Sequence, residues 1–127
     1  MKHFTKSNIK DLDKVKRLNI INSITGIKPS NLIGTINKEK MTNLAIFSSV
    51  IHLGSNPALL GFILRPQERV RRDTYNNILE NGSYTINHLP ENLTLNGHYT
   101  SAKFDKNQSE FKYCKFTEWY EDGFQAP

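Results

Sequence analysis

Two adjacent serines, Ser48 and Ser49, stand within an apolar stretch and supply hydroxyl groups that could hold a phosphate. Arg65 ends the next apolar run, and its guanidinium could give bidentate hydrogen bonds to phosphate oxygens. Residues 71–82 have the pattern of a short helix, and the free N–H groups at its start, beside the Thr74 hydroxyl, favour an anion. Together these groups could converge on one phosphate dianion.

Each of these residues also has a purely structural explanation. Ser48 and Ser49 could be ordinary strand residues with solvated hydroxyls, and taken alone that explanation is favoured. Thr74 is more often only a helix cap. The arginines of segment 69–72 usually form a solvated charged face. From the residues alone, the sequence therefore indicates a phosphate site without establishing one.

The sequence contains no assembled catalytic pair or metal-ligand set. Ser48 and His52 share a strand face, but at ~3.3 Å per residue they lie about 13 Å apart. The four histidines lack the spacing of metal ligands, and the single Cys114 has no partner for a zinc site. Neither G-x-G-x-x-G after a strand nor G-x-x-x-x-G-K occurs, so a Rossmann site and a P-loop are not indicated. We therefore predict no catalytic side chain and no metal.

Length and composition indicate one globular domain, residues 1–127, with 37% hydrophobic and 23% charged residues. The net charge of +5 favours anionic ligands weakly, because the basic residues are scattered through most of the chain. Without interleaved aromatic residues, a basic nucleic-acid-binding barrel is the last of three hypotheses, and we expect no nucleic-acid partner. A lone cysteine, no signal-peptide pattern and no apolar run of ~20 residues predict a cytoplasmic protein without a membrane span.

The chemistry-bearing residues must be positioned by short strands with few helices, which predicts a small antiparallel barrel. Within it, the nearly continuous apolar run 58–65 is typical of a strand covered on both faces. Asp73 or Thr74 is the predicted N-cap of the central helix, and Gly82 its stop. In order, we predict a helix at 7–25, strands at 31–37, 44–53 and 58–65, a helix at 71–82, a strand at 83–89, a helical segment at 91–102 and a strand at 109–120.

Four sequence stretches occur in an order and spacing that resemble one family. They are "NLIGT", "NLAIFSSVIHLGSNPALLGFILRP", "RRDTYNNILENGSYTINHL" and "GHYTSAKF". Over roughly Leu18 to Phe111, the chain resembles the flavin reductase-like family of FMN-binding split-barrel proteins. The resemblance implies a mainly β fold, a six-stranded antiparallel split β-barrel with short flanking helices. Relatives continue beyond "EDGFQAP", so we expect this chain to lack the C-terminal part of the barrel.

The resemblance also implies which residues hold the cofactor. The stretch from Asn43 to Ser49 would follow the isoalloxazine and ribityl chain, with both serine hydroxyls at the tail. Arg65 and the segment from Arg72 to Thr74 match positions that gather the phosphate, and Asn77 begins the part that packs beneath. His98 to Ser101 resembles a segment approaching the flavin from another side. The implied cofactor-binding residues are Asn43, Leu44, Ala45, Ile46, Phe47, Ser48, Ser49, Arg65, Arg72, Asp73, Thr74, Asn77, His98 and Ser101.

The activity implied by the resemblance is hydride transfer from NAD(P)H to flavin. The cofactor would be FMN, with FAD as an alternative, and the protein would be a homodimer serving a partner monooxygenase or another acceptor. Because the flavin carries the chemistry, no acid or base side chain is strictly required, in agreement with the missing catalytic pair. The alternative is a non-catalytic flavin-binding or storage module of the same fold.

Overall fold

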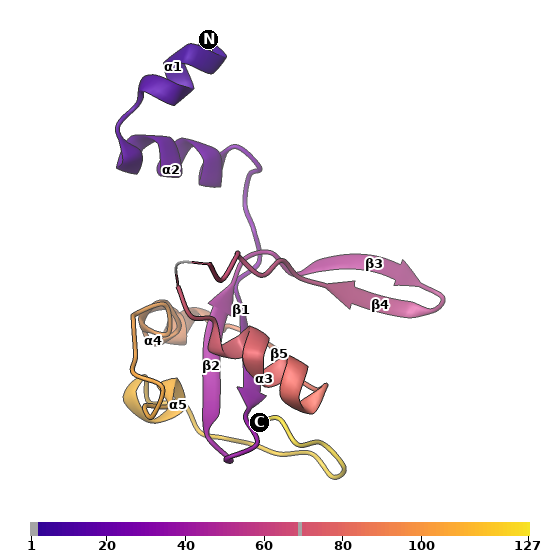
Figure 1. Ribbon diagram of the computed structural model, residues 1–127. Helices are drawn as coiled ribbons and strands as arrows, with labels where there is room; N and C mark the ends of the chain where they lie inside the picture. The colour runs from indigo at the N-terminus through magenta and orange to yellow at the C-terminus, as the bar shows by residue number, and fades with distance from the viewer. Residues whose placement is uncertain (1–2, 69) are drawn as a thin grey trace.

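The computed structural model describes residues 3–68 and 70–127. The described residues form two antiparallel sheets with short helices around them (Figure 1). In the larger sheet, β1 (Asn31–Ile36) lies between β2 (Thr42–Phe47) and β5 (Thr85–His88). The smaller sheet is a hairpin of β3 (Ile51–Ser55) and β4 (Ala58–Gly61), which extends away from the larger sheet. None of the helices in the described part combines the length and apolar character that crossing a bilayer would require.

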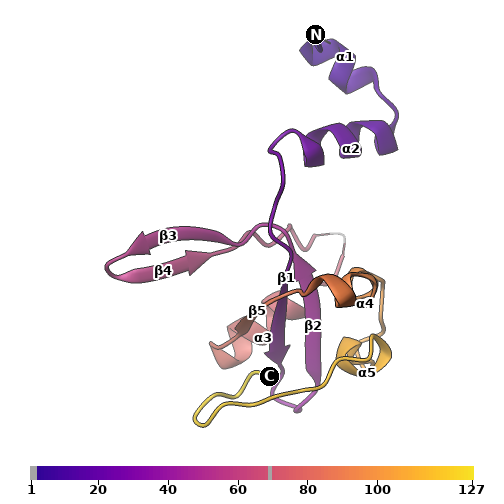
Figure 2. The ribbon, with the colours of Figure 1, turned by 180° about the vertical axis from the view of Figure 1, so that it is seen from behind.

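Strand β1 is the centre of the fold because all six of its residues are buried. Successive side chains point to opposite faces of the sheet. On one face, the β1 residue Leu32 packs with Leu44 of β2 and with Phe111 of α5 (Glu110–Tyr113). The other face, which carries Thr35, is covered by α3 (Asp73–Asn81) (Figures 1 and 2). Residues of the larger sheet are therefore shielded by different helices on its two faces.

Helix α3 and its neighbours follow the sequence pattern closely. Gly82 has a φ of 69°, a left-handed conformation that glycine adopts without steric cost, and it ends the helix as predicted. The N-cap prediction is wrong by one residue, because Arg72 occupies that position and Asp73 is already helical. The chain then returns as β5, pairing Ile86 with Ile33 of β1. The helical segment predicted next is present as a 3₁₀ turn, Glu91–Leu93, followed by α4 (Thr94–Tyr99).

Two strand predictions need correction. The predicted strand 44–53 is divided at residues 48–50, so that β2 and β3 belong to different sheets. The predicted strand 58–65 is regular only in β4, and the apolar side chains of Leu59 and Leu60 are exposed instead of covered on both faces. Because β3 and β4 pair only with each other in the described chain, this hairpin has no third strand to bury it.

The prediction of a strand at 109–120 is also wrong. Residues Glu110–Tyr113 form α5, and the rest of that stretch has no regular structure. Phe111 and Cys114 are three residues apart and both buried, which is the spacing of a helix. This spacing, and not the alternation of apolar and polar residues, corresponds to the observed structure. The two sheets do not close on each other, and the described residues contain five strands instead of a closed six-stranded barrel.

The predicted N-terminal helix 7–25 is two helices, α1 (Lys6–Asp11) and α2 (Lys14–Ser23). The two helices are separate because Asp13 is the N-cap of α2. Its side chain accepts hydrogen bonds from Val15 N–H and Lys16 N–H. Neither helix has a buried residue, and both lie away from the larger sheet (Figure 1). Arg69, which belongs to the predicted basic segment 69–72, lies outside the described residues.

Candidate functional site

The outer edge of β2 carries main-chain groups that no other strand covers in the described chain. Leu44 N–H points outward, because it donates to the Glu110 carboxylate over 3.1 Å. Since N–H directions alternate along a strand, Ile46 N–H lies on the same outer edge. The hydrogen bonds found among the described residues include none to that N–H. The edge is thus closed by α5 at Leu44 and free at Ile46.

At the end of β2, the two serines have different roles. Ser48 is exposed, so its hydroxyl is accessible to a ligand. Ser49 Oγ accepts from Ile63 N–H over 3.1 Å and donates to the Ile63 carbonyl over 3.2 Å. This pair of bonds fastens the segment after β4 to the end of β2. The Ser49 hydroxyl therefore has a structural role, because it holds the segment around Ile63 in place without a ligand.

Three aromatic rings also pack against one another where the end of β2, the segment after β4 and the residue before β5 meet. The rings of Phe47 and Phe62 meet edge to face with centroids 5.1 Å apart, and Phe62 meets Tyr84 in the same way at 5.2 Å. Arg65 follows two residues after the Ser49 contact at Ile63, and it is exposed. The main chain two residues before Arg65 is thus anchored at Ser49, and the approach of the Arg65 side chain to the serines stays a prediction.

Three other predicted site residues form a buried polar network between α3 and the sheet. Asn43 Nδ2 donates to Thr74 Oγ1 over 3.1 Å and to Thr35 Oγ1 over 3.3 Å. Asn77 Nδ2 also donates to Thr35 Oγ1, over 3.1 Å. Thr35 has no exposed surface, and the other three side chains are buried too. The buried hydroxyl of Thr35 thus joins Asn77 to Asn43, which in turn binds Thr74.

The start of α3 lies beside Asn43, near the beginning of β2, whereas the serines follow its end. Five residues along a strand correspond to about 16 Å at ~3.3 Å per residue. These contacts do not bring the serines and the helix start together at one point, as the sequence had suggested. Arg71 forms an ion pair with Asp73 over 2.9 Å, while the buried Nε of Arg72 has no hydrogen-bond partner within the described chain.

His98 and Ser101 lie at the end of α4, and both are exposed. Ser101 Oγ donates to the His98 carbonyl over 2.7 Å, which closes the last turn of the helix. In both the front and back views, α4 lies next to the end of β2 that leads to Ser48 (Figures 1 and 2). The structure therefore places this segment near the open edge of β2.

Sequence reasoning missed Thr35, Ile63 and Glu110 as residues that build this site. Thr35 is the single hydroxyl in a mostly apolar strand, which is a weak signal that a buried polar group needs partners. Glu110 lies in a segment that was wrongly predicted as a strand, and the strand pattern did not predict that its carboxylate is buried. Ile63 contributes only main-chain groups, for which the sequence carries no signal.

Burial raises the pKa of the Glu110 carboxyl above its usual value, and hydrogen bonds from Glu110 N–H and Leu44 N–H partly oppose this shift. Of the neighbouring charges, Asp73 raises this pKa and Arg71 lowers it. The folded protein therefore binds the Glu110 proton more tightly than the unfolded chain does. The contribution of Glu110 to the free energy of unfolding therefore falls as the pH rises from the ordinary glutamate pKa of 4.5 through the raised folded pKa.

We expect Glu110→Gln to flatten the decline in the free energy of unfolding above about pH 4.5, because an amide oxygen can still accept from Leu44 N–H without carrying a buried charge. Urea denaturation at a series of pH values measures this slope. The matched control is Glu39→Gln at an exposed position, which should leave the slope as in the parent protein. An unchanged slope in Glu110→Gln would show that this carboxyl does not titrate differently in the two states.

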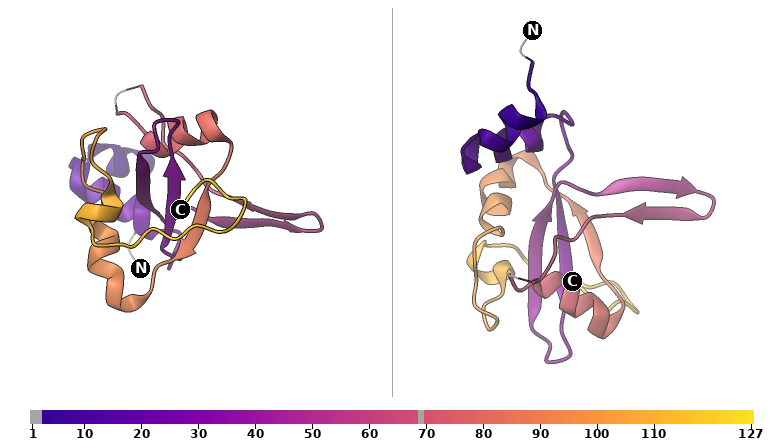
Figure 3. Two further views of the ribbon diagram at one scale, coloured as in Figure 1. Left: turned by 90° about the horizontal axis from the view of Figure 1, so that it is seen from below. Right: turned by 45° about the horizontal axis from the view of Figure 1, so that its top comes forward.

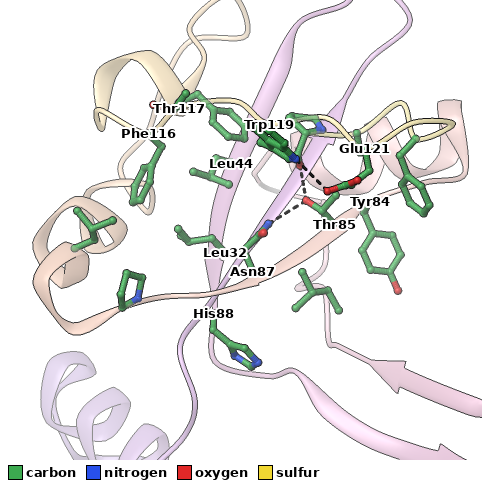
Figure 4. A pocket seen from close by; sticks show the side chains of 17 residues that line it. Leu32, Leu44, Tyr84, Thr85, Asn87, His88, Phe116, Thr117, Trp119 and Glu121 are labelled. Atoms are coloured by element: carbon green, nitrogen blue, oxygen red, sulfur yellow. Dashed lines mark hydrogen bonds between the residues drawn. The ribbon is translucent and has the colours of Figure 1, made fainter.

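The sheet face opposite α3 carries an apolar groove of about 670 Å³ (Figure 4). Leu32 and Leu44 lie on its floor, and Phe116, Trp119 and Glu121 come from the C-terminal segment beside it. None of the cofactor-binding residues predicted from the sequence lines it except Leu44. The groove is therefore distinct from the open edge of β2.

Comparison with known proteins gives a consistent result. A family model described as the flavin reductase-like domain matches residues 27–127. A crystal structure from Shewanella frigidimarina, described as a candidate flavin reductase with a split barrel domain, is 45% identical with a TM-score of 0.92. That match covers 100% of this chain and 62% of the other, so this chain spans less than two thirds of that protein. No curated protein matches at a significant level.

More distant solved structures share the fold. The 2-nitrobenzoate 2-nitroreductase of Pseudomonas fluorescens is 21% identical with a TM-score of 0.80, over 99% of this chain and 58% of that chain. Component B of nitrilotriacetate monooxygenase from Bacillus cereus is 20% identical with a TM-score of 0.75, over 91% of this chain and 55% of that chain. In both, the matched region is again a little over half of the longer protein.

Proposed function

The chain belongs to the flavin reductase-like family, and on that premise we propose that it binds FMN and transfers hydride from NAD(P)H to flavin. The observation that carries the proposal is the family match over residues 27–127, which includes every predicted cofactor-binding residue. The structural similarity to the Shewanella frigidimarina protein supports the same assignment. This chain spans only 62% of that protein. We therefore base the proposed activity on the residues present in this chain and not on the activity of the relative.

The residues at the open edge of β2 fit the chemistry of FMN. A flavin mononucleotide presents a phosphate dianion at one end and a hydrogen-bonding ring edge at the other. Ile46 N–H is a main-chain donor with no partner in the described part of the chain, and the Ser48 hydroxyl and the Arg65 guanidinium are exposed nearby in the chain. Arg72 adds a buried Nε that has no hydrogen-bond partner among the described residues, a donor that an anionic ligand would satisfy.

We assign these groups separate parts of the cofactor. The main chain from Leu44 to Phe47 would lie along the ring and ribityl chain, with Ile46 N–H directed at the ring edge. Ser48 and Arg65 would hold the phosphate, and a guanidinium suits that task because it donates two parallel hydrogen bonds. Asn43, Thr74 and Asn77 would support the site from within, because hydrogen bonds through the buried Thr35 hydroxyl already link them.

The redox chemistry, hydride acceptance from a reduced nicotinamide, is supplied by the bound flavin. The chain's own contribution is to orient the ring and to place N–H dipoles beside it. Such fixed donors stabilise negative charge that develops at a ring edge, by the same physics that operates in an oxyanion hole. His98 and Ser101, beside the end of β2, would border the space through which the nicotinamide approaches.

The acceptor of the electrons is a second part of the proposal. One structural neighbour is a component of a monooxygenase, and we propose that this chain likewise delivers reduced flavin to a partner oxygenase. We further propose that the protein acts as a homodimer. FAD is the alternative cofactor, and a non-catalytic flavin-binding or storage module is the alternative function.

The absorption spectrum of the purified protein tests the proposal. We expect a yellow preparation, and anaerobic addition of NADH or NADPH should bleach the flavin band as hydride reaches the ring. A flavin band that neither nucleotide bleaches would favour the storage module over the reductase. A colourless preparation that takes up no added FMN would contradict both.

A further inference from the structure

Glu110 carries a buried carboxylate to which the flavin site proposed above gives no role. The residue is only 8% exposed, and its helix, α5, lies along the β2 side of the larger sheet in the front and tilted views (Figures 1 and 3). Its Oε2 accepts from Leu44 N–H over 3.1 Å. Among the described residues, no lysine, arginine or histidine forms an ion pair with it. A buried carboxylate without a cation costs stability, and such groups are concentrated at functional sites.

The charges around this carboxylate leave its own charge largely uncompensated. Burial is the main cause of its raised pKa, and of the nearby charges Asp73 raises this pKa while Arg71 lowers it. These two residues pair with each other over 2.9 Å, so their effects on Glu110 partly offset. One turn further along α5, burial and the Glu110 charge together raise the pKa of the Cys114 thiol. When Glu110 is ionised, a negative charge therefore stands inside the protein between α5 and β2.

This charge lies on the same edge of β2 that we assign to the flavin ring. Leu44 N–H and Ile46 N–H both point to the outer edge, and two residues along a strand are about 7 Å apart at ~3.3 Å per residue. Glu110 occupies the first of these donors, while the second has no partner in the described part of the chain. The buried carboxylate is therefore the neighbour of the N–H group that would receive the ring edge of the cofactor.

We infer that Glu110 couples the reduction of the bound flavin to the uptake of a proton, an inference that rests on the flavin site proposed above. Hydride transfer brings two electrons and one proton to the ring. Reduced flavin that takes no further proton carries one more negative charge than the oxidised form. The Glu110 carboxylate would then take one proton from the solvent. In total two electrons and two protons are added, and the negative charge at this edge does not increase.

The physical reason is the repulsion of two like charges in a poorly solvated site, which acts equally in both directions. The ionised carboxylate makes the flavin harder to reduce, and reduction of the flavin makes the carboxylate more basic. Even at about 10 Å, Coulomb's law with an effective dielectric constant of about 20 gives roughly a tenfold effect on an equilibrium. While Glu110 is ionised, the reduced flavin is therefore a stronger reductant towards its acceptor.

The reduction potential of bound FMN, measured against a reference dye at a series of pH values, tests the inference. Glu110→Gln removes the charge but keeps an acceptor for Leu44 N–H, so the fold should be retained. In alkaline solution its potential should exceed that of the parent protein by about 30 mV or more, which is a tenfold change for a two-electron couple. In acidic solution, where the parent carboxyl is protonated, the difference should vanish. Reduction with dithionite makes the measurement independent of any nicotinamide.

The matched control is Glu118→Gln, which removes the same charge from the next carboxylate along the chain. Glu118 is exposed and accepts from Thr42 Oγ1 over 2.6 Å at the opposite end of β2 from the serines, so its charge is both solvated and distant. We expect this variant to shift the potential far less at every pH. Infrared difference spectra supply a second readout. Reduction of the parent protein in alkaline solution should produce the band of a protonated carboxylic acid, and Glu110→Gln should lack this band.

Several results with flavin-loaded protein would overturn the inference. Potentials of Glu110→Gln and the parent protein that agree at every pH would do so, and so would a difference that is constant with pH, because it would come from packing and not from charge. An equal shift in Glu118→Gln, or an infrared band that is missing in the parent or persists in Glu110→Gln, has the same meaning. A protein that takes up no FMN contradicts the proposed function itself, so the two failures are distinguishable.

Discussion

Replacement of Arg65 by alanine is expected to weaken FMN binding by about ten- to a hundredfold while riboflavin binding stays nearly unchanged. The loss corresponds to about 1.5 to 3 kcal/mol, the usual contribution of a hydrogen bond to a charged group. Only FMN carries the phosphate dianion, so the difference between the two ligands isolates the phosphate contact. Fluorescence titration of apoprotein with each flavin measures both affinities.

Arg65 is better suited to this experiment than the neighbouring serine. Ser49 Oγ bonds to both main-chain groups of Ile63, so Ser49→Ala would disturb the chain that leads to Arg65. The Arg65 side chain is exposed and forms no ion pair within the described residues. Its removal should therefore leave the fold intact and change only what the guanidinium contacts.

The matched control for the phosphate experiment is Arg71→Ala. This substitution removes the same charge from the same part of the chain, but the Arg71 guanidinium already pairs with Asp73 over 2.9 Å. We expect Arg71→Ala to change FMN affinity far less than Arg65→Ala does. Equal losses for the two variants, or equal losses of FMN and riboflavin in Arg65→Ala, would remove Arg65 from the phosphate site.

Thr35→Val is expected to lower the free energy of unfolding by about 1 to 3 kcal/mol, because it leaves buried amide donors without an acceptor. Valine has nearly the shape of threonine, so packing is preserved and only the hydroxyl is lost. Asn77 loses the acceptor for its Nδ2, and Asn43 keeps only the contact to Thr74. Since this network fastens α3 to the sheet, we also expect weaker binding of FMN and riboflavin alike.

Chemical denaturation of Thr35→Val, Thr35→Ser and a surface control measures this effect. Thr35→Ser retains the hydroxyl and should recover most of the lost stability. Thr117→Val, at an exposed position, should change the free energy of unfolding by less than about 0.5 kcal/mol. If Thr35→Val is as stable as the parent protein, or if serine fails to rescue it, the buried network does not hold α3 in place.

Local signals predicted several elements of the fold correctly. The β1–β2 hairpin follows from two apolar runs around a polar turn, and its register pairs Ile33 with Ala45. Helix α3 follows from apolar residues at helical spacing and a glycine stop at Gly82. These features depend on residues close together in sequence, so the local pattern was sufficient to predict them.

Elements whose structure depends on distant partners were predicted wrongly. The run 58–65 is apolar enough for a core strand, yet β4 pairs only with β3 in the described chain and stays exposed. The stretch 109–120 alternates like a strand, but Phe111 packs on Leu32 and Leu44 from a helical turn. The periodicity of the sequence alone could not predict the structure of either segment. The burial of a side chain depends on which other part of the protein packs against the segment.

The candidate site shows the same division. Residue types alone indicated a phosphate-binding arginine and serines, and in the structure the main chain of Ile63, two residues before Arg65, is hydrogen-bonded to Ser49. The sequence also suggested that Thr74 joins them at a single point. In the structure the Thr74 hydroxyl accepts from Asn43 in the protein interior instead, a contact that spans 31 positions of the chain.

The amino-acid sequence by itself determined the kinds of chemical groups present, the polar turn between β1 and β2, the glycine stop of α3, and the family to which the chain belongs. The tertiary structure alone decided which hydroxyls and amides are buried with one another, which edge of β2 stays open, and which apolar side chains are left uncovered. The physical reason is that propensity and capping act over a few residues, whereas burial and hydrogen-bond pairing depend on segments that folding brings together.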